Sequence, residues 1–290
     1  MTGDSFDLII AMEPLPFAGA GIPKSTELLV AAARAGALPV VEVGGQDEVA
    51  AAVESIARRA DGPVALQPAS AHVALEDWDA PEAVSTLVLS ASVAADLLAS
   101  GRLGDAIGFR ADAGLRVIVE ITDAASARSA VAAGASGLIA KGCESGGRVG
   151  CTESFILCQQ TVGLGVPVWV RGGIGLHTAA AAVALGARGV VLDTQLALVR
   201  ESRLPEATRT AIAAMDGSET RVIGDHRVFV RPDLPVASRP ASAEPSVIAA
   251  ELGSDIARHL LPIGQDAAFA SKLAARFKTA GGVVEAIRSS

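Results

Sequence analysis

The stretch that decides the fold runs from residue 137 to residue 193. It contains GLIAKGCESGGRVG at 137–150, VPVWVRGGIG at 166–175 and GVVLD at 189–193. Each segment opens with an apolar run, as a strand buried in a parallel sheet does, and the first two runs end in glycines. Glycine after the carboxyl end of a strand lets backbone N–H groups approach an anion closely. The stretch therefore predicts a repeated order of strand, site loop and helix.

The same alternation extends toward the N-terminus. Five further strands are predicted at residues 7–12, 38–43, 64–67, 86–90 and 115–121. Seven helical connections join the eight strands, among them helices predicted at residues 26–35, 46–59, 94–100, 123–133 and 178–185, and an eighth helix is predicted at residues 205–215. An open doubly wound sheet needs neither an eighth strand nor site loops at so many strand ends. The pattern thus predicts an α/β fold of the (β/α)8 TIM-barrel type.

The chain is expected to divide into a barrel at residues 1–219 and a C-terminal helical extension at residues 220–290. The extension should contain a hairpin excursion at 220–232, a linker rich in Pro, Ser and Ala at 236–245, and helices at 248–259 and 266–278. A last helical turn is expected to open at Gly281-Gly282. We expect these helices to pack on the barrel.

Composition excludes several classes of protein. A net charge of −8 without a basic run argues against a nucleic-acid partner. No uncharged apolar segment reaches the length of a membrane span of about 18 residues, and the N-terminus lacks the layout of a signal peptide. These features predict a cytoplasmic protein without a membrane partner. The three cysteines fit no zinc spacing, and their odd number argues against a disulfide framework, so we expect small buried side chains and no metal site.

Charged side chains gather at the predicted carboxyl ends of the strands, where TIM barrels carry their chemistry. These strand ends hold Met12, Glu13, Glu42, Gln67, Ser90, Glu120, Lys141, Arg171 and Asp193. A buried charge costs several kcal/mol unless it is paired, so Lys141 is expected to pair with Glu120 or Asp193. Structural pairing and a chemical role both stay open at this point.

The motif Gly172-Gly173-Ile-Gly175 precedes a predicted helix. Exposed N–H groups and the positive end of a helix dipole bind anions, and phosphate sites after the seventh and eighth strands recur in this fold. The motif predicts a phosphate site, with a tight turn as the alternative.

Several segments together resemble a known family. They are the motif Ser145-Gly-Gly-Arg148-Val-Gly150, the run 166–190 and the C-terminal Gly264-Gln265-Asp-Ala. The chain resembles the nitronate monooxygenases, formerly 2-nitropropane dioxygenases, and equally the flavin-dependent enoyl-acyl-carrier-protein reductases. The nearest resemblance is to family-like domains embedded in modular polyketide synthases, through residues 144–150, 152–159 and 261–268.

The resemblance implies an FMN-binding barrel whose flavin phosphate lies on the loops after the last two strands. The cofactor contacts that it implies, together with the strand ends, are Met12, Gln67, Lys141, Gly146, Gly147, Gly172, Gly173, Thr194 and Gln265. The candidate catalytic residues are Arg148, Lys141, Glu120 and Glu13.

The chain departs from the family pattern at two positions. Arg148 stands where the family places its catalytic histidine, and a guanidinium cannot remove a proton although it can hold an anion. Asp193 precedes Thr194 where the family usually has glycine, and its carboxylate would repel a phosphate unless a cation offsets it. Glu13 and Glu120 are therefore the predicted proton-transfer residues, since burial among carboxylates raises a pKa.

Three functions follow as hypotheses. The first is an FMN-dependent oxidoreductase, interpreted as a polyketide synthase domain, that acts on a small carbon acid or on an acyl chain bound to a carrier protein. The second is a degenerate, non-catalytic barrel that docks other domains of a polyketide synthase. The third is a flavin-free dehydratase or isomerase that uses the charged mouth for acid–base chemistry.

Overall fold

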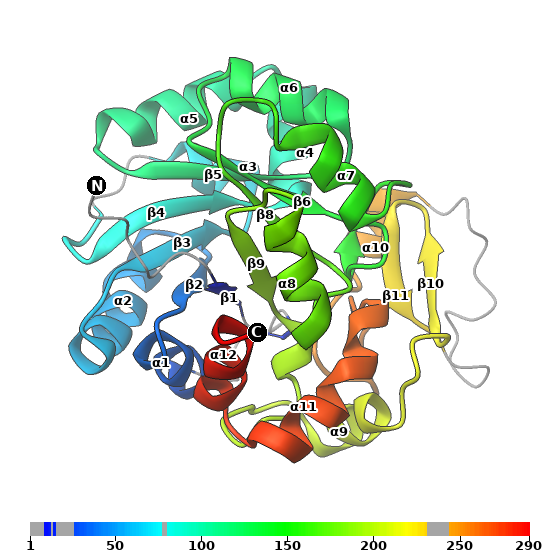
Figure 1. Ribbon diagram of the computed structural model, residues 1–290. Coiled ribbons are helices and arrows are strands. Elements are labelled where there is room, and N and C mark those ends of the chain that lie inside the picture. The colour runs from blue at the N-terminus through cyan, green and yellow to red at the C-terminus, as the bar shows by residue number, and fades with distance from the viewer. Residues whose placement is uncertain (1–8, 13, 16–25, 77–79, 231–243) are drawn as a thin grey trace.

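Eight parallel strands close into a barrel in a computed structural model, which describes residues 9–12, 14–15, 26–76, 80–230 and 244–290 (Figure 1). The barrel strands are β1 (Ile9–Ala11), β2 (Leu38–Val43), β3 (Val64–Pro68), β4 (Val84–Leu89), β5 (Arg116–Ile121), β6 (Gly137–Lys141), β8 (Val168–Arg171) and β9 (Gly189–Leu192). Pairing of β9 with β1 closes the ring, with Ile9 opposite Val190. The predicted (β/α)8 barrel is confirmed.

Helices follow most of the strands. They are α1 (Thr26–Arg34), α2 (Gln46–Ala60), α3 (Ala71–Leu75), α4 (Ala91–Ala99), α5 (Leu103–Asp112), α6 (Ala124–Ala132), α7 (Ser154–Thr161), α8 (Leu176–Ala184) and α9 (Glu206–Ala213). Side chains of Ser70, Ser90 and Asp123 accept N–H groups in the first turns of α3, α4 and α6, which satisfies donors that a helix leaves free. None of the helices within the described ranges is long and apolar enough to cross a membrane.

Helix α5 was missed by the sequence prediction, which places one helix between β4 and β5 where the structure has two. Gly104 and Gly108 lie within α5, and glycine lowers helix propensity by about 1 kcal/mol relative to alanine. The helix forms because Leu103, Ala106 and Ile107 are buried in the core. Tertiary packing thus outweighs the local preference.

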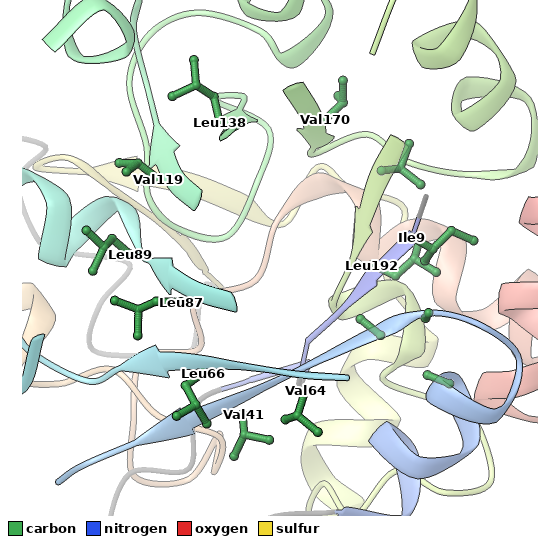
Figure 2. Packing of buried hydrophobic residues seen from close by; sticks show 14 of the residues in the cluster. Ile9, Val41, Val64, Leu66, Leu87, Leu89, Val119, Leu138, Val170 and Leu192 are labelled. Carbon is green, nitrogen blue, oxygen red and sulfur yellow. The ribbon is translucent and has the colours of Figure 1, made fainter. Parts of the chain in front are cut away.

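The barrel strands separate two apolar layers. Alternate residues such as Val41, Leu66 and Val119 face the surrounding helices (Figure 2). The residues between them form a second cluster of Ile10, Met12, Leu38, Val40, Ala65, Val88, Ile118, Ile139, Trp169 and Val191. Successive side chains of a strand point to opposite faces, so one set fills the interior of the barrel while the other holds the helices.

The C-terminal helix α12 (Ala280–Arg288) completes the outer layer. It packs against α1 and α8, between which it lies in Figure 1. Gly281 permits the contact, because a Cβ there would lie 3.0 Å from the carbonyl oxygen of Ala31. The predicted eighth helix at 205–215 forms as α9, but α9 packs against α11 (Ala270–Phe277). The helix beside α1 is therefore α12, which lies about 250 positions after α1 in the sequence and is not the helix that follows the eighth strand.

The remaining C-terminal residues form a small sheet and a helical segment. The predicted hairpin is confirmed as β10 (Thr220–Ile223) and β11 (His226–Phe229), which pairs with β7 (Gly147–Arg148) in the loop after β6. The helix predicted at 248–259 is wrong beyond α10 (Pro245–Ala249), because the run Gly253-Ser-Asp255 turns the chain. The predicted linker lies almost entirely outside the described residues. The domain boundary at residue 219 stays a prediction.

Leu66→Ala is expected to lower the free energy of unfolding by about 2–5 kcal/mol, because Leu66 is fully buried between the barrel and its helices. Val183→Ala on α8 is the matched control, since Val183 is 56% exposed, and should change stability by less than about 0.5 kcal/mol. Urea denaturation followed by circular dichroism measures both. Equal losses in the two variants would contradict the placement of Leu66.

Candidate functional site

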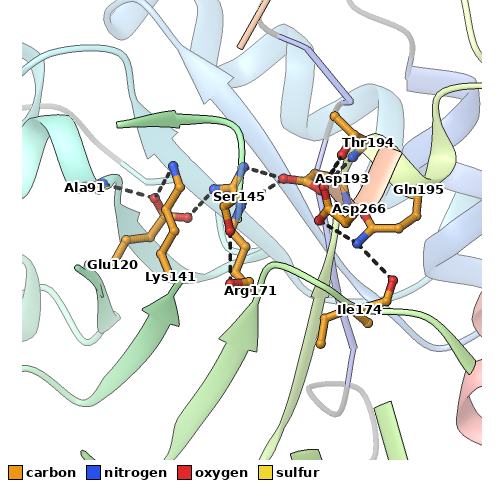
Figure 3. Close-up of polar contacts among 10 residues, drawn as sticks. All are labelled: Ala91, Glu120, Lys141, Ser145, Arg171, Ile174, Asp193, Thr194, Gln195 and Asp266. Atoms are coloured by element: carbon orange, nitrogen blue, oxygen red, sulfur yellow. Dashed lines mark hydrogen bonds and ion pairs between the residues drawn. The ribbon is translucent and has the colours of Figure 1, made fainter. Parts of the chain in front are cut away.

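Arg171 joins two carboxylates across the carboxyl end of the barrel (Figure 3). Its Nε and Nη2 donate to Oδ2 of Asp193 at 2.9 and 2.7 Å, and its Nη1 donates to Oε1 of Glu120. Burial alone would lower the pKa of Arg171, but attraction to Glu120 and Asp193 outweighs burial and raises this pKa. The expected repulsion from Asp193 is therefore offset by a fixed cation.

The Glu120 carboxylate has three partners: Arg171, the backbone N–H of Ala91 and Lys141. Besides Arg171, its Oε2 accepts the N–H of Ala91 at 3.0 Å and lies 3.8 Å from Nζ of Lys141, so the predicted pair of Lys141 with Glu120 is confirmed. Burial favours a raised pKa for Glu120, but Arg171, Lys141 and the Ala91 N–H together lower it. The expectation of a raised pKa at Glu120 is wrong, because cations rather than carboxylates surround it. Glu120 is a carboxylate at neutral pH.

Lys141 is a buried ammonium group whose pKa is lowered. Burial and the nearby charge of Arg171 lower its pKa to about 8, although Glu120 and Asp193 partly offset both effects. Its side chain is only 6% exposed. Lys141 is thus a cation at neutral pH that loses its charge within the range in which enzymes are assayed.

A pocket of about 200 Å³ opens over these residues. Most of the predicted site residues line it, namely Met12, Gln67, Glu120, Lys141, Gly146, Gly147 and Arg148, and Arg171 lies at its wall. Pockets for drug-sized ligands usually measure about 300–1,000 Å³, so this one suits a small molecule or one part of a larger one. Glu13 lies outside the described residues.

Arg148 reaches this pocket from strand β7 but is itself ion-paired. Its Nε lies 2.8 Å from Oδ2 of Asp225, and its Nη1 lies 3.8 Å from Oδ1 of Asp96. The side chain is 28% exposed. The prediction that Arg148 holds an anionic ligand stays a prediction.

Four predicted cofactor contacts do not line the pocket: Gly172, Gly173, Thr194 and Gln265. Thr194 lies in a second polar cluster, where its N–H donates to Oδ1 of Asp193 at 2.6 Å and its hydroxyl donates to Oδ1 of Asp266 at 3.0 Å. Nε2 of Gln195 donates to Oδ2 of Asp266, also at 3.0 Å. The hydroxyl predicted to bind a phosphate is thus engaged by the chain's own carboxyl groups.

Asp266 and Gln195 are site residues that the sequence analysis did not identify. Asp266 is 1% exposed, and burial together with the charge of Asp193 raises its pKa to about 8. It is therefore a neutral acid at pH 7. The sequence could have indicated Asp266, because this residue directly follows Gly264-Gln265 in the C-terminal motif that resembles the family. What the sequence could not show is that this motif reaches Thr194.

The glycine pair also faces a carboxylate. A Cβ on Gly172 would lie 3.1 Å from Cγ of Glu144, and a Cβ on Gly173 would lie 3.4 Å from Oε1 of Glu144. Backbone N–H of Ser154, the first residue of α7, donates to both Glu144 oxygens at 3.1 and 3.2 Å. Glu144 therefore lies between the start of α7 and the glycines after β8.

Residues 262–266, here called the capping segment, pack directly against the loop that carries Glu144. A Cβ on Gly146 would lie only 1.9 Å from the carbonyl oxygen of Pro262, so only glycine fits there. Backbone N–H of Gln265 donates to the carbonyl oxygen of Glu144 at 2.8 Å. The capping segment brings Asp266 to Thr194.

These contacts decide how well FMN fits the residues present. The pocket beside Lys141 offers a cation to the ring system of a flavin. The region predicted for the phosphate does not fit a dianion, because Glu144 lies against the glycine pair and Asp193 and Asp266 engage Thr194. Arg171, the cation beside this region, already pairs with Glu120 and Asp193.

An eight-stranded parallel barrel with charged side chains at the carboxyl ends of its strands is the architecture of the TIM-barrel enzymes. Residues 6–227 match the model of one family within this class, described as nitronate monooxygenase. The chain therefore belongs to the nitronate monooxygenase family, whose members are in general flavin-dependent oxidoreductases.

Two curated relatives carry the same name, (3aS,4S,5R,7aS)-5-hydroxy-7a-methyl-1-oxo-octahydro-1H-indene-4-carboxyl-CoA dehydrogenase. The protein from Mycobacterium tuberculosis is 31% identical over 77% of this chain, and the protein from Rhodococcus jostii is 27% identical over 74%. The aligned regions span 64% and 61% of the lengths of these relatives.

Solved structures share the fold. FabK from Thermotoga maritima has a TM-score of 0.73 at 23% identity, over 96% of this chain and 92% of its own. Nitroalkane oxidase from Streptomyces ansochromogenes has a TM-score of 0.71 at 20% identity, over 97% of this chain and 95% of its own. At these identities the likeness concerns the fold alone.

Proposed function

We propose that the protein is a flavin-dependent oxidoreductase that acts on a small carbon acid or an acyl thioester in the pocket beside Lys141. The observation that carries the proposal is a buried ammonium at the pocket wall, held by Glu120 within a nitronate monooxygenase-family barrel. Removal of a proton next to a nitro or thioester carbonyl group places negative charge on an oxygen. A fixed cation in a desolvated pocket stabilises such an oxyanion more than water does.

Each residue of the cluster has a distinct part in this proposal. Lys141 would face the substrate oxygen, while Glu120 fixes the ammonium and Arg171 fixes Glu120. Glu120 is a poor proton donor because its pKa is lowered, which speaks against a dehydratase that uses it as general acid. Arg148 would orient an anionic part of the substrate at the pocket rim.

The acyl-thioester class draws support from the two curated relatives, which are named as carboxyl-CoA dehydrogenases. Delivery of the acyl chain on a carrier protein within a polyketide synthase belongs to the same proposal. FMN is the flavin that the sequence analysis predicts, and a bound flavin would supply the acceptor or donor of electrons. Because the phosphate region does not fit, we assign no FMN contact there.

A second candidate is a docking barrel without turnover. It is favoured by one observation, the carboxyl groups that fill the region predicted for the phosphate. Two measurements separate it from the oxidoreductase: the visible spectrum of the purified chain with and without added flavin, and turnover of a primary nitroalkane and an acyl-CoA thioester. A flavin spectrum perturbed by the protein together with turnover supports the oxidoreductase. An unperturbed spectrum and no turnover support the docking barrel.

Lys141→Met is expected to reduce kcat/KM by about a hundredfold, because the cation that stabilises the oxyanion is lost. In the wild type, kcat/KM should fall as the pH rises through about 8, since the ammonium deprotonates there. Lys141→Arg keeps a positive charge and should move that alkaline fall to higher pH. An alkaline limb unchanged in Lys141→Arg would assign the titration to another group.

A further inference from the structure

The capping segment and Glu144 together fill the place where this fold binds phosphate, after the seventh and eighth barrel strands. Glu144 lies against Gly172 and Gly173 after β8, the seventh barrel strand, and receives the N–H of Ser154. Asp266 accepts a hydrogen bond from the hydroxyl of Thr194, which follows β9, the eighth barrel strand. Each carboxyl group thus takes hydrogen bonds or space that an incoming phosphate would need.

The charges of this region are also satisfied without a ligand. Asp193 uses one oxygen for Arg171 and the other for the N–H of Thr194. Asp266 is linked on its second oxygen to Gln195, whose side-chain amide also donates to the carbonyl oxygen of Ile174 at 3.2 Å. A phosphate placed here would meet carboxyl groups and donors that are already bonded to one another, rather than free donors.

We propose that Glu144 and Asp266 act as a built-in substitute for a ligand phosphate, so that this chain binds riboflavin at least as tightly as FMN. The proposal rests on the proposed function in taking a flavin as the ligand of the pocket. Selectivity is set by the two carboxyl groups: they exclude the phosphate arm and leave the ring system free to reach Lys141.

The experiment compares the dissociation constants of riboflavin and FMN by quenching of flavin fluorescence. In the wild type, FMN should bind no tighter than riboflavin. In Glu144→Ala/Asp266→Ala, which removes both carboxyl groups and opens space, FMN should gain at least about tenfold over riboflavin, since one hydrogen bond to a charged group is worth this much. Glu144→Gln/Asp266→Asn replaces both carboxyl groups by amides of the same shape and opens no space, so its gain should be smaller.

Glu54→Gln/Asp105→Asn is the matched control. It removes two negative charges from side chains that are 60% and 61% exposed, and the ratio of the two constants should not change. Circular dichroism verifies that each variant is folded. If Glu144→Ala/Asp266→Ala does not fold, Glu144→Gln/Asp266→Asn is used for the comparison in its place.

Each possible result of the binding measurements either supports or overturns the inference. A wild type that binds FMN about tenfold tighter than riboflavin overturns the inference, and so does an FMN preference that the carboxyl variants leave unchanged. If the wild type binds neither flavin, gain of FMN binding in the variants supports the inference, whereas no binding in any protein overturns it. Riboflavin binding by the wild type tests whether the pocket takes a flavin at all, as the proposed function requires. The ratio of the two dissociation constants tests the role of the carboxyl groups, so failure of the inference can be told from failure of the proposed function.

Discussion

Arg171→Met is expected to lower the free energy of unfolding by about 3–5 kcal/mol at pH 7, the cost of leaving buried charges without their partner. Arg171 is the cation that joins Glu120 to Asp193, and both carboxylates are almost completely buried. The loss should shrink as the pH falls toward about 4, because Arg171 helps to lower the pKa of Glu120, and without that cation Glu120 takes up a proton more readily. Urea denaturation at several pH values measures the effect.

Arg59→Met is the matched control for this prediction. Arg59 also pairs with a glutamate, Glu27, but their side chains are 39% and 46% exposed. Water solvates Glu27 once its partner is gone, so the loss should be much smaller and nearly independent of pH in this range. Adding Asp193→Asn to Arg171→Met should recover part of the stability. An equal loss in Arg59→Met would contradict the role assigned to burial.

Asp266→Asn is expected to be more stable than the wild type at pH 8, by about 1–3 kcal/mol. The folded-state pKa of Asp266 is raised to about 8, above the unfolded value of about 3.9. Between these values the folded state holds more protons than the unfolded state, so the contribution of Asp266 to stability is complete below pH 4 and is lost as the pH rises through about 8. Asparagine mimics the protonated acid and removes this loss.

The measurement is the difference in unfolding free energy between Asp266→Asn and the wild type from pH 4 to pH 8.5. It should be near zero at the acid end and grow with pH. Asp105→Asn, on an exposed side chain, should show no such growth. A difference that stays flat across the range would mean that Asp266 is ionised in the folded protein.

Much of the fold was predictable, because local patterns decide it. Strand β6 was predicted with its observed limits, since an apolar run that ends in glycine is typical of a strand buried in a parallel sheet. Helix α5 and the turn after α10 were not, because tertiary packing decides the first and a short polar turn decides the second. The position of α12 beside α1 depends on a contact between the two ends of the chain, which no local pattern reveals.

The site was predictable by strand position but not by electrostatics. Lys141 and Glu120 were placed at one mouth because the carboxyl ends of parallel strands meet there. The sign of the shift in the pKa of Glu120 depends on Arg171 lying beside it, 51 positions away in the chain. The filling of the phosphate region by Glu144 and Asp266 arises from loop packing, which the motifs alone do not specify.

The position of α12 has a consequence for synthesis on the ribosome. Helix α1 emerges early, yet the face that it turns toward α12 stays uncovered until residues 280–288 have left the exit tunnel. During that interval the nascent barrel exposes apolar surface around Ala31 and Ala35, which chaperones recognise. Covering of this face by α12, in addition to closure of the strand ring, is therefore needed before the apolar surface of α1 is protected from aggregation.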